Sequence, residues 1–408
     1  MSTPPWARSA AGANTYDAVT GTVLPTIYER TTAAAAAHGG INLGQGFPDT
    51  EGPQWMRESA AEAITTAAGP TNQYSPGPGF GWFREAVVSH QQRHYGTDLD
   101  PETQVLHTTG ATEAIAATIL AFAAEGSEVV TFEPFYDSYG SMVALAGAQL
   151  RTIPLRAPDF RPDVDALEAA VTDRTSMVLV NTPHNPTGVV FSPAELERIV
   201  GIAARHGAVV MADEVYEHLI MDDAAYQHQT ILTIPGAAQV AVAIGSAGKS
   251  FSLTGWKVGW VTGNPELVNR VRGVKQFTTF CTGGVFQYAV AQGLEDDRGF
   301  FAANQAELQT GRDLLMEGLA AAGLTPYRPD AGYFVLADVA GVTDKTAAEF
   351  AAELVAHAGV GAIPVSSLTL PSTQKDHDDE LNSLLRFAFC KRHDVLETAL
   401  NRLAAWIG

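Results

Sequence analysis

Residues 177–213 have the sequence MVLVNTPHNPTGVVFSPAELERIVGIAARHGAVVMAD. Met177–Val180 and Val209–Ala212 are continuous apolar runs, which are typical of strands covered on both faces by helices. Between them, Ser192-Pro193-Ala194-Glu195 places a capping serine, a proline and a glutamate in the order that begins a helix, and Gly207 stands where that helix would end. The stretch therefore predicts a strand–helix–strand unit of a parallel sheet.

Apolar runs of the same kind recur on both sides of this unit, alternating with helical patterns. We expect strands at residues 104–107, 128–132, 149–154, 177–180, 209–212, 240–244 and 259–262. Residues 58–302 are therefore predicted to form a large α/β domain, with a mostly parallel seven-stranded sheet sandwiched by helices.

The pattern changes near residue 303. We expect helices at 303–322 and 346–357, strands at 333–338 and 384–389, a loop at 371–379 and an amphipathic terminal helix through 395–403. Together with residues 31–57, this region predicts a smaller α+β domain. Residues 1–30 contain several prolines and glycines and little periodicity, so we expect an extended arm that leads into a short helix near 27–38.

Composition excludes several classes of protein. The chain has 408 residues, 46% of them apolar and 17% charged, which is typical of a packed globular protein. Its net charge of −20 disfavours nucleic acids and anionic membranes as partners. There is no apolar run of membrane-spanning length and no basic-then-apolar start, so we expect neither a membrane span nor a signal peptide. Two distant cysteines, Cys281 and Cys390, fit a reducing cytoplasm.

Ligands of parallel α/β sheets bind at the carboxyl ends of the strands, so the residues that follow each apolar run are candidates for a site. The turn at Thr108–Glu113 contains Gly110 and can present backbone N–H groups to an anion, although an ordinary strand-to-helix turn has the same pattern. Asn185 lies in a proline-rich loop after the strand at 177–180. Asp213, which would otherwise be a helix cap, follows the strand at 209–212.

Lys249 follows the strand at 240–244 in a loop of small residues, Ser246-Ala247-Gly248-Lys249-Ser250. A lysine near apolar walls or other cations has a lowered pKa and can attack a carbonyl, although a salt-bridged structural lysine fits the same position. Combined with the Gly110 turn, Lys257, Asp213 and Asn185, it supplies what a pyridine cofactor with a carbonyl and a phosphate requires. We find no cluster of histidine, cysteine or carboxylate ligands at metal spacing and expect no metal site.

The segment 246–260, SAGKSFSLTGWKVGW, resembles the lysine segment of class I, fold-type I pyridoxal-phosphate aminotransferases, and the likeness extends over roughly residues 25–405. Asn185-Pro186-Thr187-Gly188 and Asp213-Glu214-Val215-Tyr216 resemble two further motifs of that family, in the same order. The motifs at 42–49 and 133–137 are similar to the kynurenine, glutamine and methionine aminotransferase branch. Those at 72–79 and 110–115 are similar to actinobacterial N-succinyldiaminopimelate aminotransferases.

The resemblance implies how the chain would hold pyridoxal 5′-phosphate. Lys249 would bond covalently to the cofactor and later move the substrate's proton, and Asp213 would pair with the ring nitrogen. Asn185 and Tyr216 would bind the phenolic oxygen, and Phe135 would stack on the ring. The phosphate would be held by two backbone amides, those of Ala111 and Thr112, and by the side chains of Ser246 and Lys257.

The resemblance also implies a substrate site and a homodimer whose active sites are shared across the interface. Arg386 would clamp the substrate carboxylate, Gly46 would let that carboxylate approach the backbone, and Tyr28 would contact the substrate. Tyr74 would reach the phosphate of the neighbouring subunit. Tyr28 stands where kynurenine-type enzymes carry tryptophan, and Ala111 and Thr112 are small where some members have an aromatic residue, so kynurenine specificity is in doubt.

We therefore expect a cytoplasmic enzyme that moves an amino group from an amino acid to a 2-oxo acid such as 2-oxoglutarate. N-succinyl-diaminopimelate, methionine, glutamine and kynurenine all remain open as donors. A cysteine-S-conjugate (carbon–sulfur) β-lyase is the alternative, since it uses the same motifs. A cofactor-sensing regulator would need an added basic DNA-binding domain, and the acidic chain with its short N-terminal arm does not supply one.

Overall fold

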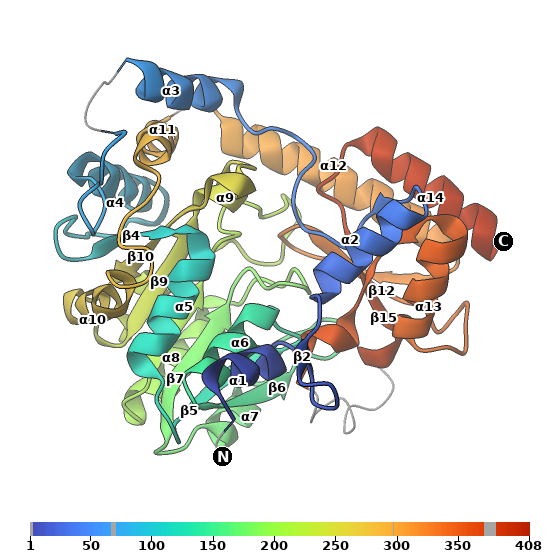
Figure 1. The fold of residues 1–408 in the computed structure, drawn as a ribbon, viewed down its shortest axis with the longest axis horizontal. Coiled ribbons are helices and arrows are strands. Elements are labelled where there is room, and N and C mark those ends of the chain that lie inside the picture. Colours follow the sequence, from blue (N-terminus) through green and yellow to red (C-terminus); the bar gives the residue numbers. More distant parts are fainter. Residues whose placement is uncertain (1–2, 67–70, 297, 371–380) are drawn as a thin grey trace.

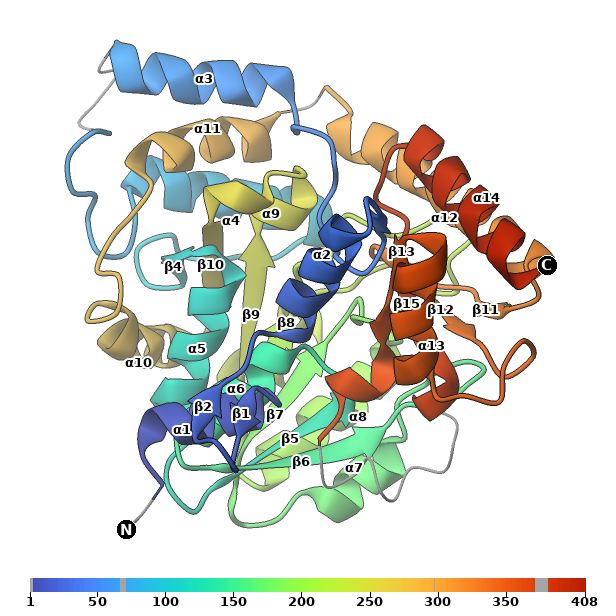
Figure 2. The same cartoon turned by 45° about the vertical axis from the view of Figure 1, so that its right-hand side comes forward.

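A computed structural model describes residues 3–66, 71–296, 298–370 and 381–408 (Figures 1 and 2). Its large sheet has seven strands in the order β4-β10-β9-β8-β7-β5-β6. The strands are β4 (Val105–Thr109), β5 (Glu128–Glu133), β6 (Gln149–Pro154), β7 (Thr175–Asn181), β8 (Val209–Asp213), β9 (Ala241–Ser246) and β10 (Val258–Gly263). Every run predicted as a strand of this sheet is one. Only β10 runs in the opposite direction to the other six strands.

Helices cover both faces of this sheet, which is why its strands are apolar throughout. In β7, Met177 and Leu179 pack into the core under α5 and α10, whereas Val178 and Val180 pack against α7 and α8 on the other face. The helices of this domain are α4 (Gly81–Tyr95), α5 (Gly110–Phe122), α6 (Asp137–Leu145), α7 (Val164–Ala170), α8 (Pro193–Arg205), α9 (Ala247–Ser250), α10 (Pro265–Lys275) and α11 (Gly284–Glu295). Ser192 caps α8 in a capping box with Glu195, as predicted.

The smaller domain lies beside the large sheet; most of it is orange and red in Figure 1, and its helix α2 is blue. Its antiparallel sheet has the order β11-β12-β15-β14, and β3 pairs with β13 in parallel. The strands are β3 (Ile41–Asn42), β11 (Thr325–Tyr327), β12 (Phe334–Asp338), β13 (Val360–Gly361), β14 (Ile363–Pro364) and β15 (Leu384–Ala388). The helices are α2 (Ile27–Ala37), α12 (Phe300–Ala321), α13 (Ala347–Glu353), which continues as a π-helical turn at Leu354–Ala358, and α14 (His393–Ile407).

The expectation of an extended N-terminal arm is wrong in part. Residues Pro5–Gly12 form helix α1, which packs on α6, and β1 (Tyr16–Asp17) pairs with β2 (Thr22–Val23). Pro5 suits the first turn of a helix, where its missing N–H costs nothing. A Cβ on Gly12 would lie 2.3 Å from the backbone oxygen of Gly140 in α6, so the contact needs glycine. Packing against α6 thus stabilises a helix in a segment whose sequence shows little helical periodicity.

The predicted domain boundaries fall within helices. The boundary after residue 57 lies inside α3 (Gln54–Thr65), which packs beside α11 in both views, and the boundary after residue 302 lies in the first turn of α12 (Figures 1 and 2). The division into domains therefore remains a prediction. The predicted loop at 371–379 lies outside the described residues. None of the described helices is both long and apolar enough to cross a bilayer.

Candidate active site

A cavity of about 360 Å³ lies at the carboxyl ends of the large sheet, where the smaller domain contributes β12 and β15. The side chains that follow four strands of the large sheet meet there, as expected for this type of sheet. Its lining includes all of the predicted site residues except Phe135 and Tyr74, namely Tyr28, Gly46, Ala111, Thr112, Asn185, Asp213, Tyr216, Ser246, Lys249, Lys257 and Arg386.

Lys249 lies in the short helix α9, directly after β9. Its Nζ donates a hydrogen bond to the backbone oxygen of Gly46 at 3.0 Å and lies 5.5 Å and 5.2 Å from the ring centres of Tyr216 and Tyr333. Burial lowers the pKa of Lys249 from 10.5 to about 8, and the nearby Arg386 guanidinium acts in the same direction. About a tenth of this amine is therefore unprotonated at pH 7, far more than for an ordinary lysine, and this form can act as a nucleophile or as a base.

Asp213 ends β8 and faces the same cavity. Tyr139 Oη donates a hydrogen bond to Asp213 Oδ2 at 2.5 Å, and the backbone N–H of Val215 donates to Oδ1 at 3.4 Å. Burial raises the pKa of Asp213 from 3.8 to about 6, although both hydrogen bonds and the Lys249 ammonium favour the ionised form. A buried carboxylate of this kind is stabilised when a cationic N–H group binds beside it.

The turn between β4 and α5 forms the predicted anion cradle. Gly110 has a φ of +69° and begins α5, so the first N–H groups of the helix, including those of Ala111 and Thr112, have no intrahelical partner. Lys257 Nζ donates to Thr112 Oγ1 at 3.2 Å, and a Cβ on Gly110 would lie only 3.1 Å from Lys257 Cε. Ser246, the N-cap of α9, lines the cavity as well. Such an arrangement binds anions.

Arg386 is 1% exposed and interrupts the apolar strand β15. Its Nη1 donates to Asn185 Oδ1 at 3.1 Å and its Nη2 donates to the backbone oxygen of Gly44 at 2.7 Å. Its guanidinium lies 3.9 Å from the ring centre of Phe334, and its Nε has no hydrogen-bond partner in the described part of the chain. A buried guanidinium without a carboxylate partner among the described residues has N–H groups left for an anionic ligand.

The charges that line the cavity are unbalanced. Its cationic side chains are Lys249, Lys257 and Arg386, whereas Asp213 is the one acidic side chain among the described lining residues. This local excess of positive charge stands in a chain of net charge −20. The donor set therefore suits a ligand that carries anionic groups at two places, the Gly110 turn and Arg386, with a carbonyl near Lys249. Pyridoxal phosphate bound with an amino acid has these features.

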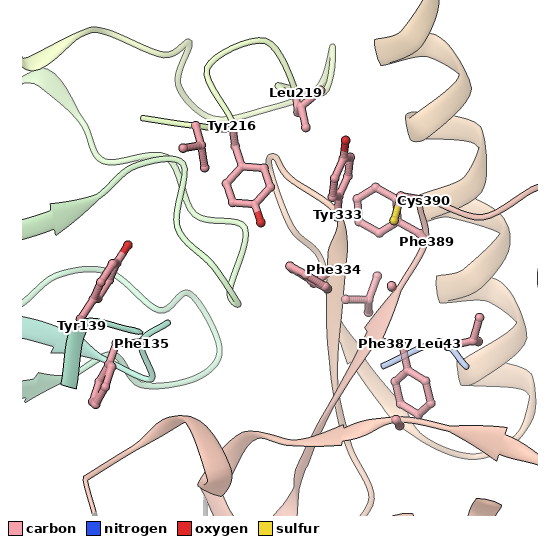
Figure 3. Close-up of a cluster of buried hydrophobic side chains, with 14 of the residues drawn as sticks. Leu43, Phe135, Tyr139, Tyr216, Leu219, Tyr333, Phe334, Phe387, Phe389 and Cys390 are labelled. Atoms are coloured by element: carbon pink, nitrogen blue, oxygen red, sulfur yellow. The ribbon is translucent and has the colours of Figure 1, made fainter. Parts of the chain in front are cut away.

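Two predicted roles need correction or stay open. Phe135 does not line the cavity: it is 3% exposed, packs against Gly140 and points away from Tyr139 in Figure 3. Tyr136, the next residue, lines the cavity instead. Phe135 belongs to the core because the chain turns at the end of β5, so that only one of the two adjacent aromatic residues can face the cavity. Tyr74 is 84% exposed and lies outside the cavity, so its role across a subunit interface stays a prediction.

Several lining residues were missed at the sequence level. Tyr139 holds Asp213, Asn181 Nδ2 donates to the backbone oxygen of Asp213 at 2.9 Å, and Asn181 Oδ1 accepts from the backbone N–H of Asn185 at 2.7 Å. Phe334 supports the guanidinium of Arg386. Asn181 directly follows an apolar run, which could have indicated it. Nothing in the local pattern indicates Tyr139, because its helix, α6, reaches Asp213 only through the packing of helix on sheet.

The chain is similar to known aminotransferases over nearly its whole length. Residues 38–403 match the family model described as aminotransferase class I and II. The probable N-succinyldiaminopimelate aminotransferase DapC of Mycobacterium tuberculosis is 44% identical over 384 residues, covering 93% of this chain and 95% of the relative. The methionine aminotransferase of Escherichia coli is 34% identical over 378 residues, covering 93% and 95%.

Solved structures agree with this similarity. The N-succinyldiaminopimelate aminotransferase from Mycobacterium tuberculosis superposes with a TM-score of 0.88 at 44% identity, over 93% of this chain and 97% of that one. These relatives are named for amino-group transfer, which disfavours the lyase alternative. With a family model that matches most of its length and relatives that are 34–44% identical over nearly the whole chain, the chain belongs to the class I and II aminotransferases and is a transaminase.

Proposed function

We propose that the chain uses pyridoxal 5′-phosphate, held in the cavity at the carboxyl end of the large sheet. The observation that carries the proposal is the convergence of Lys249, Asp213 and Arg386 on that cavity. The Gly110 turn, Ser246 and Lys257 would hold the phosphate, and Asp213 would accept a hydrogen bond from the ring nitrogen. The aromatic surface beside the ring would come from Tyr136, and the phenolic oxygen would be bound by Asn185 and Tyr216.

When bound, pyridoxal phosphate supplies a carbonyl carbon that receives the amino group and a ring that accepts electrons from the substrate Cα. The chain supplies the proton transfers and the positioning. Lys249, with its pKa lowered to about 8, would take the proton from the substrate Cα and return it during the reaction. Asp213, held ionised by Tyr139 and by the positive charge of the ring, would keep the ring nitrogen protonated. Arg386 would fix the α-carboxylate so that the Cα–H bond faces the Lys249 amine.

We further propose an amino acid as donor and a 2-oxo acid, first 2-oxoglutarate, as acceptor. Both carry the α-carboxylate that Arg386 would bind. N-succinyldiaminopimelate is the first donor to test because a relative that is 44% identical is named for it, and methionine is the second for the same reason at 34%. Tyr28, whose ring centre lies 5.5 Å from the Arg386 guanidinium carbon, is placed to contact the donor side chain.

We propose a homodimer located in the cytoplasm. Tyr74 and Phe280 contact each other edge to face at 5.8 Å, and both are exposed, as is Phe277 at 84%. These exposed aromatic residues support an interface with a second copy of the chain. The thiols of Cys281 and Cys390 are unpaired, which fits a reducing compartment. Light scattering should give twice the mass of one chain.

The deciding experiment replaces Lys249 with alanine. In the wild-type protein, borohydride reduction should attach a pyridoxyl group to the peptide that contains Lys249, and donor plus 2-oxoglutarate should yield glutamate. Lys249→Ala should lose the label and at least about 10³-fold in turnover, because it lacks the group that moves the proton. Lys345→Ala, which removes an exposed lysine paired with Glu353, is the matched control and should change neither. The proposal would be overturned if the pyridoxyl group were found on a peptide without Lys249, or if Lys249→Ala kept full turnover.

A further inference from the structure

Three histidines meet outside the active-site cavity. His90 and His94 lie one turn apart on α4. His218 lies 124 residues after His94 in the sequence, in the segment that follows β8. One ring nitrogen from each lies within 4.8 Å of the others. The expectation that no ligand cluster exists at metal spacing is therefore wrong. The sequence shows only the pair at i and i+4, and the third histidine arrives through the packing of α4 against the segment after β8.

The geometry of the cluster is close to that of a metal centre. His90 Nε2 lies 2.7 Å from His218 Nε2, and the ring centres are separated by 4.6 Å for His90–His94 and 4.9 Å for each of the other pairs. Two nitrogens bound to one zinc ion at about 2.0–2.1 Å in tetrahedral geometry lie about 3.3 Å apart. The ion would replace the hydrogen bond between these two nitrogens, which would move apart by roughly 0.6 Å, and the ring of His94, whose nitrogen lies within 4.8 Å of the others, would rotate toward them.

The cluster is largely shielded from solvent. His90 is fully buried and His218 is partly buried, whereas His94 is exposed. Neutral imidazole is the form that binds transition metals. Glu217 precedes His218, is 4% exposed, and accepts a hydrogen bond at 3.3 Å from Gln91, the residue after His90. This hydrogen bond ties the segment that carries His218 to helix α4.

Access to the cluster comes from the side of His94. That residue is exposed, whereas His90 is buried and His218 is partly covered by Phe301, whose ring stacks on it at 3.7 Å. A cavity lined by His94, Tyr95 and His228 adjoins this side. An ion bound here could keep a water molecule in a fourth position, and nitrogen ligands select zinc-like ions over magnesium or calcium.

We propose that His90, His94 and His218 bind one divalent transition-metal ion, with zinc as the probe. His218 lies two residues after Tyr216, which lines the active-site cavity. The ion would therefore link α4 to the segment that carries Tyr216 and would stabilise the folded chain by mass action.

The experiment uses the full-length enzyme with its cofactor, treated with a chelator, desalted and titrated with Zn²⁺ in a calorimeter. We expect saturable binding of one ion per chain and a rise in the midpoint of thermal unfolding. His94→Gln keeps a polar side chain at an exposed helical position and removes one ligand. It should weaken zinc binding at least about tenfold, since loss of even an outer-shell partner costs 10- to 100-fold, and should abolish most of the thermal shift.

His38→Gln is the matched control, because His38 is exposed at the end of helix α2 and does not belong to the cluster. It should bind zinc as the wild-type protein does. Absence of one-per-chain binding would overturn the proposal. So would equal zinc affinities of His94→Gln and His38→Gln, because the zinc would then bind elsewhere. The aminotransferase assay is independent of these outcomes, and the zinc site does not rest on the proposed cofactor.

Discussion

Replacing Arg386 with lysine tests how the substrate carboxylate is held. In the structure the guanidinium donates through Nη1 to Asn185 and through Nη2 to the Gly44 oxygen, and each of these nitrogens keeps one further N–H. A lysine ammonium has three donors, so after satisfying the same two acceptors it keeps one. The substitution therefore removes one of two charge-assisted hydrogen bonds to the carboxylate. Such a bond contributes about 1.5–3 kcal/mol, which corresponds to a loss of about 10- to 150-fold in kcat/KM.

The assay is the steady-state kcat/KM for an amino acid donor, compared with that for the amine that lacks its carboxylate. The loss should be confined to the amino acid, because the amine has nothing for Arg386 to bind. Arg392→Lys, at an exposed arginine of the same domain paired with Asp394, is the control and should leave both values unchanged. Equal losses on acid and amine, or a loss below about threefold on the acid, would refute the reasoning. Thermal unfolding of each variant reports whether the buried site still folds.

Two further predictions concern stability and backbone fit. Burial raises the pKa of Asp213 from 3.8 to about 6, so the folded chain holds this proton more tightly than the unfolded chain, and the ionised group costs stability as pH rises through that interval. In cofactor-free protein, the stability of Asp213→Asn relative to wild type should therefore rise by roughly 2 kcal/mol between about pH 4 and pH 7 in urea unfolding, and a constant difference would contradict this. A Cβ on Gly46 would lie 2.2 Å from Phe334 Cζ, so Gly46→Ala should cost roughly 1–3 kcal/mol of unfolding free energy and raise KM for the donor. Gly81→Ala, in the first turn of α4, meets no atom within 4 Å, so it should not lower the unfolding free energy and should leave KM unchanged.

The strands of the large sheet could be predicted because a strand that is buried on both faces has apolar residues at every position, which is visible in the local sequence. Runs such as Met177–Val180 are apolar at every position, and the caps of α8 are visible as Ser192 and Gly207. The α1 helix could not be predicted as readily, because its order depends on contact with α6 across more than a hundred residues. The cluster of His90, His94 and His218 was missed for the same reason.

The chemistry of the active site could be predicted from short motifs, since its key residues lie at the carboxyl ends of strands or within a few residues after them. Lys249, Asp213 and Asn185 follow three different strands, and the parallel sheet brings strand ends to one edge. The choice between Phe135 and Tyr136 could not be predicted, because a shift of one residue at a strand end reverses which side chain faces the cavity.

The amino-acid order alone determined the two kinds of sheet, the lysine and carboxylate that the chemistry needs, and the excess of acidic residues over the whole chain. The packing of distant segments decided the rest: the burial that shifts the pKa values of Lys249 and Asp213, the support that Phe334 and Gly44 provide to Arg386, and the meeting of His218 with α4. Residue types and strand ends are encoded locally, whereas desolvation and contacts between remote segments exist only once the chain has folded.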